Sequence, residues 1–81
     1  MEDKVYINEI FPVKLQLEDL DDLLNISSNV NGLINLVQGT TVASAKSVLG
    51  LFNIDYTKPC KLLIQAYLNE DELFEFKKYK I

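Results

Sequence analysis

The residues TTVASAKSVLGLF, at positions 40–52, carry the most informative pattern in this chain. They begin as a strand-like run at 40–42 and pass through small residues into a short amphipathic segment. Val48, Leu51 and Phe52 are spaced i, i+3 and i+4, so they share one face of a helix. Ser47 stands immediately before this apolar set, where the N-cap of a helix belongs. The pattern therefore predicts a strand followed by a short helix from Ser47 to about residue 53.

Strand signals lie on both sides of this segment. Residues 33–37 form a β-rich run, and Gln38-Gly39 predicts a hairpin turn between that run and a strand over 40–43. The clearest alternation covers residues 60–68. One face of that strand is predicted to consist of Cys60, Leu62, Ile64, Ala66 and Leu68. This face is the best candidate for the centre of the core.

The N-terminal part of the chain predicts a strand and then a helix. The strand is expected over residues 4–9, and Pro12 keeps the path after it extended. A helix is expected to begin at Glu18 or Asp19 and to end within 27–29. Acidic residues crowd its first turn, where they complement the positive end of the helix dipole.

The last element is expected to be a helix over residues 70–79. Asn69 followed by Glu72 predicts a capping box at its start, and lysines close its final turn. Between the first helix and the second strand, Asn31-Gly32 is a typical turn signal.

The predicted order of elements is βαββαβα in a single domain over residues 1–81. Four strands with interspersed helices need one covered sheet face, so we expect an α+β, two-layer open-faced sandwich. A ferredoxin-like or small-ligand regulatory domain shares most of this order and is the alternative. The period-two pattern predicts that Cys60, Leu62, Ile64 and Ala66 point toward the helices.

Composition limits the classes of function. The net charge is −4 and the chain contains neither arginine nor histidine. Nucleic acid and anionic membranes are therefore disfavoured as partners, because both need clustered cations. Without histidine the chain lacks the commonest general base and metal ligand, so we expect no enzyme, no metal and no cofactor. The single cysteine, Cys60, fits a reducing cytoplasm.

Two adjoining stretches resemble one known family. Residues ASAKS, at 43–47, resemble the strand-to-helix junction around the regulatory serine of the histidine-containing phosphocarrier protein (HPr) of the sugar phosphotransferase system. Residues VLGLF, at 48–52, resemble the hydrophobic helix of HPr that faces its kinase. The resemblance implies one antiparallel four-stranded sheet with three helices on one face. The predicted element order agrees with it along nearly the whole chain.

The residues that would carry phosphate in HPr are missing. The resemblance places Leu15 or Gln16 where the phosphorylated histidine belongs, and Leu17 or Glu18 where an arginine belongs. Fixed negative charge surrounds the same helix start, at Glu18, Asp19, Asp21 and Asp22. A calcium loop would need a glycine turn and regularly spaced ligands, so this acidic run predicts a solvated helix start and no metal site. Phosphocarrier activity is not expected.

The resemblance instead implies a regulatory or protein-binding role. Ser47 is the candidate for regulatory phosphorylation, where phosphate would meet a helix N-terminus. The candidate residues that face the kinase or another partner are Lys46, Val48, Leu49, Leu51 and Phe52. HPr kinase or a transcriptional regulator is the expected partner. The alternative is an interaction module of HPr-like or ferredoxin-like fold, unrelated to sugar transport.

Overall fold

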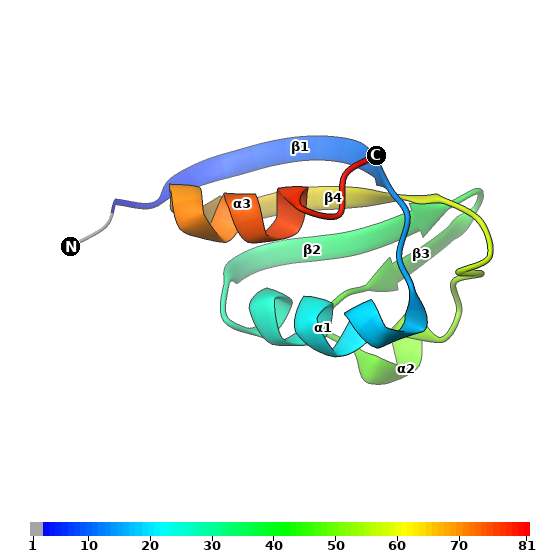
Figure 1. Ribbon diagram of the computed structural model, residues 1–81. Helices are drawn as coiled ribbons and strands as arrows, with labels where there is room; N and C mark the ends of the chain where they lie inside the picture. The colour runs from blue at the N-terminus through cyan, green and yellow to red at the C-terminus, as the bar shows by residue number, and fades with distance from the viewer. Residues whose placement is uncertain (1–2) are drawn as a thin grey trace.

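The structure is a computed structural model that describes residues 3–81 (Figure 1). Its elements follow the predicted order, with one short 3-10 helix, η1, added before the first α-helix. The elements are β1 (Val5–Val13), η1 (Leu17–Asp19), α1 (Leu20–Ser28), β2 (Asn31–Gln38), β3 (Thr41–Ser44), α2 (Val48–Leu51), β4 (Cys60–Leu68) and α3 (Glu70–Lys77).

The four strands form one antiparallel sheet in the order β1-β4-β2-β3. The first and last strands of the chain are therefore neighbours, and β4 pairs on one side with β1 and on the other with β2. The helices cover one side of the sheet, and the other side stays open (Figure 1). This arrangement confirms the predicted α+β open-faced sandwich.

The core lies between the sheet and the helices. The predicted inward face of β4 is confirmed, because Cys60, Leu62, Ile64, Ala66 and Leu68 are all buried. Phe76 of α3 and Leu23 of α1 are fully buried against the sheet. The Cys60 thiol is free, and its burial raises its pKa, so it is an apolar packing residue.

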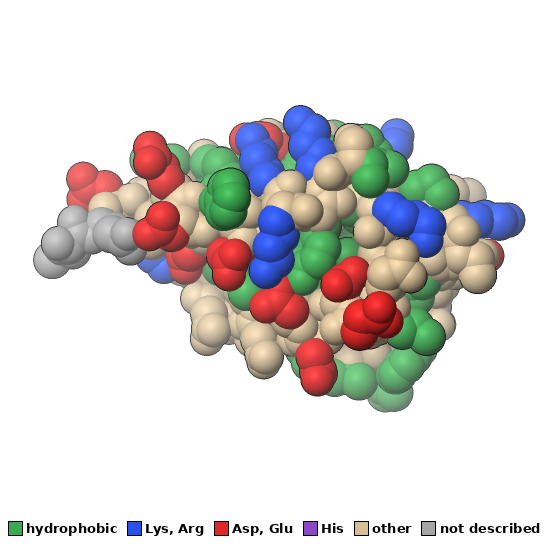
Figure 2. Space-filling view, in the orientation of Figure 1, with side chains coloured by type: hydrophobic (Ala, Val, Ile, Leu, Met, Phe, Trp, Pro, Cys, Tyr) green, Lys and Arg blue, Asp and Glu red, His purple; other side chains and the backbone are tan. Residues whose placement is uncertain are grey.

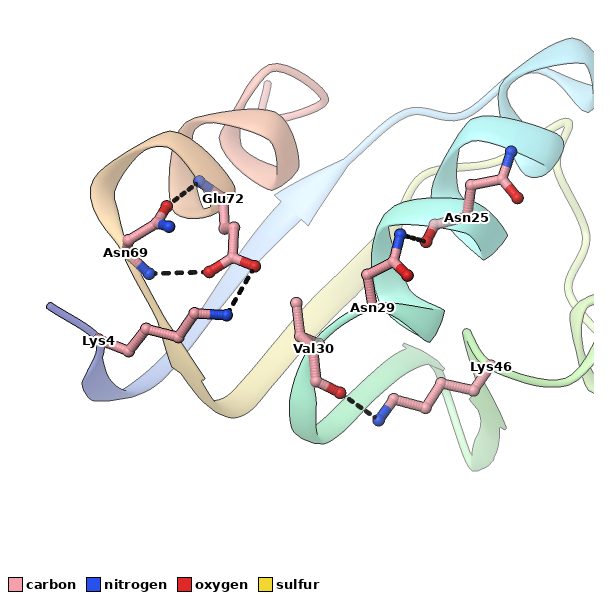
Figure 3. Close-up of polar contacts among 7 residues, drawn as sticks. All are labelled: Lys4, Asn25, Asn29, Val30, Lys46, Asn69 and Glu72. Carbon is pink, nitrogen blue, oxygen red and sulfur yellow. Dashed lines mark hydrogen bonds and ion pairs between the residues drawn. The ribbon is translucent and has the colours of Figure 1, made fainter. Parts of the chain in front are cut away.

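The predicted capping box of α3 is confirmed. The Asn69 Oδ1 accepts a hydrogen bond of 2.8 Å from the Glu72 N–H, and the Glu72 Oε1 accepts one of 3.0 Å from the Asn69 N–H (Figure 3). Lys4 of the N-terminal segment adds an ion pair of 3.1 Å to Glu72. The bond from the Asn69 N–H, followed by the contact with Lys4, lowers the pKa of Glu72. Within residues 3–81, no helix is long and apolar enough to cross a membrane.

Two turn predictions need correction. Asn31 and Gly32 do not form a turn, since they begin β2 and pair with Tyr67 and Ala66. Gly32 has a φ of +142°, and a Cβ there would lie 2.5 Å from the Cα of Ala66, so this glycine serves the close approach of two strands. The β2–β3 hairpin turns one residue later than predicted, at positions 39–40, with Gly39 at a φ of +59°.

Three element boundaries also differ from the prediction, and one of them is the end of α3, which lies at Lys77 and not at residue 79. Strand β1 continues beyond residue 9 to Val13 because Pro12 lies on an edge strand, where its missing N–H costs no ladder bond. Helix α2 ends at Leu51 and does not reach residue 53. The Phe52 N–H bonds to the Leu49 carbonyl at 3.3 Å, an i to i−3 contact that tightens the chain and ends the helix.

Ser27 provides a test of the core. It is fully buried in α1, and its Oγ has no hydrogen-bond partner among residues 3–81. Because a buried unpaired hydroxyl is costly, Ser27→Ala should leave the free energy of unfolding unchanged or raise it by up to about 1 kcal/mol. Urea unfolding measures this.

The neighbouring serine is a matched control. The Ser28 Oγ is exposed and donates to the Leu24 carbonyl at 2.7 Å, so Ser28→Ala should change stability by less than about 0.5 kcal/mol. Leu23→Ala, at a fully buried position of the same helix, should cost about 2–5 kcal/mol. A loss of more than about 1 kcal/mol in Ser27→Ala would show that the hydroxyl has a stabilising partner.

Candidate functional site

A groove lies where the start of α1 meets α2. Its volume is about 370 Å³, and its lining is mainly apolar. The lining residues are Leu17, Glu18, Leu20, Asp21, Leu24, Val48, Leu51 and Phe52. The two segments are about thirty positions apart in sequence, and the fold brings them side by side (Figure 1). Glu18 and Asp21 are the charged residues of the lining.

Large apolar side chains stand exposed around this groove. Phe52 and Leu17, which line the groove, are 69% and 67% exposed. Leu49 of α2 lies outside the lining and is 80% exposed. Figure 2 shows hydrophobic side chains gathered at the position of α2, next to acidic side chains over the start of α1. Leu51 is buried and forms the floor, so it contributes shape and not exposed surface. A contiguous exposed apolar patch of this kind is typical of an interaction site.

The Ser47 side chain caps α2, as the sequence predicts. The Ser47 Oγ accepts a hydrogen bond of 3.1 Å from the Gly50 N–H, and Ser47 is half-buried. A Cβ at Gly50 would lie 3.3 Å from that Oγ, so glycine allows the cap to close. At the other end of α2, the Tyr56 hydroxyl donates to the Leu51 carbonyl. Burial raises the pKa of Tyr56 to about 12, which keeps this hydroxyl protonated.

Lys46 is placed differently from the other candidate partner-facing residues. Its Nζ donates to the Val30 carbonyl at 2.9 Å and to the Gly32 carbonyl at 2.7 Å. Figure 3 shows the lysine reaching from the segment before α2 to the end of α1. Lys46 thus ties that segment to the start of β2. Val48, Leu49 and Phe52 are the candidates that present exposed surface.

The three positions that the resemblance assigns to a former phosphate site, Leu15, Gln16 and Leu17, differ in their exposure. Leu15 is 1% exposed and belongs to the core, whereas Gln16 and Leu17 are exposed. Under the predicted resemblance to HPr, the exposed Gln16 and not the buried Leu15 would take the place of the missing histidine. The Gln16 N–H donates a hydrogen bond of 2.8 Å to the Asp19 Oδ2. This backbone donor is therefore already bonded to a carboxylate of the same chain. Leu17 lines the groove.

The acidic run does not act as one charged patch. Asp22 forms an ion pair of 2.7 Å with Lys78 and accepts a hydrogen bond from the Tyr79 hydroxyl. The Lys78 bond, followed by the Tyr79 bond, lowers the pKa of Asp22. Asp22 therefore connects α1 to the segment after α3. Glu18 and Asp21 lie at the groove instead.

The side chain of Gln38 holds the loop beneath α2, and no local signal in the sequence pointed to it. Its Nε2 donates to the Asp55 carbonyl and its Oε1 accepts from the Asp55 N–H, both at 2.8 Å. Lys14 donates to the Tyr56 carbonyl at 2.8 Å. Among residues 3–81, no cluster of three or more potential metal ligands is present.

No family model, curated protein or solved structure matches this chain. The resemblance to HPr therefore stays a prediction that rests on residues 43–52 and on the order of the elements.

The Ser47 cap gives a prediction on stability. Ser47→Ala should lower the free energy of unfolding by roughly 1 kcal/mol, because the Gly50 N–H loses its acceptor. Ser47→Asp should keep most of that stability, since aspartate is also a good N-cap. Urea unfolding of both variants measures the difference. Equal losses in the two variants would contradict a capping role, and Thr40→Ala in the exposed hairpin serves as the control.

Proposed function

We propose that this chain is a non-catalytic, HPr-like binding protein whose groove between α1 and α2 holds a segment of a partner protein. The observation that carries the proposal is the set of exposed apolar side chains, Leu17, Val48 and Phe52, that line a groove with a buried apolar floor. Covering them would remove apolar surface from water, at about 25 cal/mol for each Å².

The negative charge at the groove favours a bound segment that is positively charged. Glu18 and Asp21 line the groove, and the whole chain is acidic with a net charge of −4. Among the residues that line the groove no cation is present. We therefore propose that the bound segment carries apolar anchors flanked by lysine or arginine. Such complementarity speeds encounter and fixes the orientation of the bound segment.

A phosphohistidine carrier is incompatible with this chain. The full sequence contains no histidine, and the surface counterpart of the missing one is Gln16. An incoming phosphate would also meet Asp19, whose carboxylate already accepts the Gln16 N–H. Like charges at contact repel by about 1 kcal/mol per pair in water, and by more when partly desolvated. The proposal is therefore binding without phosphate transfer.

Phosphorylation of Ser47 is the proposed control of the groove. The residue is half-buried and directly precedes Val48, which lines the groove. A phosphate would add about −1.5 to −2 charges there and would release the Oγ from its present bond to Gly50. Partner choice would change more than the fold. In this proposal the kinase is an HPr kinase, the partner can be a transcriptional regulator, and the compartment is the cytoplasm.

The alternative function uses the same groove without this regulation. An interaction module of HPr-like or ferredoxin-like fold, unrelated to sugar transport, would bind its partner through Val48, Leu49 and Phe52 but would be no substrate of an HPr kinase. The two functions therefore agree on the groove and differ at Ser47.

The groove is tested with a synthetic amphipathic helical peptide. The peptide has leucine at i, i+3, i+4 and i+7 and lysines at both ends, which matches the proposed apolar and acidic surface. In an NMR titration, the amide signals of Val48, Leu51 and Phe52 should shift. Phe52→Asp should weaken binding by at least about tenfold, because it removes an exposed apolar contact and adds like charge to the groove.

Two controls make this titration decisive. A peptide with glutamate in place of lysine should bind more weakly, and the difference should shrink at high salt. Val42→Asp, on the opposite side of the sheet, should leave peptide binding unchanged. Shifts spread over β1 and β4, with none in α2, would contradict the groove as the binding surface.

The regulatory part is tested by incubation with an HPr kinase and ATP. Mass spectrometry of the product should map one phosphate to Ser47, and Ser47→Ala should remain unmodified. The matched control is Ser44→Ala, which should be modified like the original chain. An unmodified chain, or phosphate on Ser27, Ser28 or Ser44, would favour the alternative function and leave Ser47 as a cap.

A further inference from the structure

The open face of the sheet is unusually apolar for a surface without a covering layer. Its exposed apolar residues are Tyr6 and Ile10 of β1, Tyr67 of β4, Leu33 of β2 and Val42 of β3. Their exposed fractions lie between 41% and 60%. All four strands contribute, so the apolar surface extends over the whole width of the sheet.

Strand register joins these residues into one surface. Tyr6 stands opposite Tyr67, with an edge-to-face ring contact of 5.3 Å between centroids. Ile10 stands opposite Leu63, and Val37 stands opposite Val42. The polar residues between them are uncharged, such as the Asn8–Gln65 pair, whose side chains lie 3.3 Å apart.

The open face carries fewer charged side chains than the helical side. Among the strand residues that the structure describes, Lys61 is the one charged side chain on the open face. The single acidic strand residue, Glu9, points to the helical side and pairs with Lys77 of α3 at 3.1 Å. The open face has too few charged side chains to form ion pairs with a strongly charged partner. A second copy would meet a nearly neutral surface, although the whole chain carries a charge of −4.

We infer that a second copy of this chain covers the open face, in a two-fold symmetric dimer that packs sheet against sheet. A strand of nine residues is about 30 Å long and strands lie about 4.8 Å apart, so the face offers roughly 500 Å² per copy. The pair would bury about 1,000 Å² in total, at the lower limit of specific interfaces, so the dimer should be weak and depend on concentration.

The ends of β4 suggest the orientation. Lys61 lies at one end of the open face, whereas Tyr67 and its partner Tyr6 lie at the other. A two-fold axis that runs across the strands turns one copy end for end. Each Lys61 then lies over the tyrosine pair of the other copy, where a cation is attracted to aromatic rings. The two lysines are also kept apart.

Sedimentation velocity tests the inference on the whole chain. Over about 1 μM to about 1 mM, the measured mass should rise from that of the 9.3 kDa chain toward twice that value. Because the interface is apolar and the distributed charge opposes association, added salt should strengthen the dimer or leave it unchanged. Concentration-dependent NMR shifts should fall on the open-face residues.

Two variants and one control locate the interface. Ile10→Lys and Leu33→Lys each add a cation to a surface that faces itself, and each should weaken the dimer by at least about tenfold. Both positions are exposed, and circular dichroism checks that the variants fold. Leu49→Lys, in the exposed turn of α2, changes the α1–α2 surface and should leave the dimer intact.

Specific outcomes overturn the inference. A chain that stays monomeric up to about 1 mM leaves this face to another protein or a lipid surface, and the inferred dimer is then wrong. A dimer that Leu49→Lys disrupts, and that Ile10→Lys and Leu33→Lys do not, uses the helical side instead. Neither result bears on peptide binding in the groove, because that titration is read from the signals of α2 and the dimer uses the open face of the sheet.

Discussion

Burial of one face of β4 is the constraint on which the rest of the structure depends. This strand pairs with both β1 and β2, and its inward residues from Cys60 to Leu68 are at most 6% exposed. A slip of one residue would turn every one of these side chains to the open side. The register is therefore strongly specified, and it determines which side of the sheet the helices must cover.

The groove follows from this one-sided covering, but side-chain bonds to backbone groups give it its shape. Helix α2 has only four residues and could not persist as an isolated helix. Leu51 anchors it in the core, Ser47 caps its start, and Tyr56 binds its last carbonyl. Lys46 holds the segment that precedes it. The exposed residues of α2 are thus held in place by two local bonds, at Ser47 and Tyr56, and by the contacts of Lys46 and Leu51 with more distant parts of the chain.

Sequence periodicity predicted the elements because each pattern is local. The alternation from Cys60 to Leu68 and the Asn69–Glu72 capping box required no knowledge of distant residues. The prediction of a turn at Gly32 was wrong because glycine is needed there for close packing against Ala66. Ala66 is distant in sequence but adjacent in the sheet. The bonds of Lys46 to carbonyls could not be predicted either, since any carbonyl is a possible acceptor and only the fold selects one.

The acidic residues at the start of α1 place negative charge at a helix N-terminus, which would otherwise favour an anion. Asp19 accepts the N–H of Gln16, so the chain supplies its own anion at the turn where the predicted resemblance to HPr would place a phosphate. Asp22 is neutralised by Lys78, so Glu18 and Asp21 are the acids that would meet the proposed partner at the groove. Exposed charges contribute little affinity but do select the sign of the partner. In the proposed complex, burial of the apolar groove residues Leu17 and Phe52 would therefore supply more of the binding energy than any single acid.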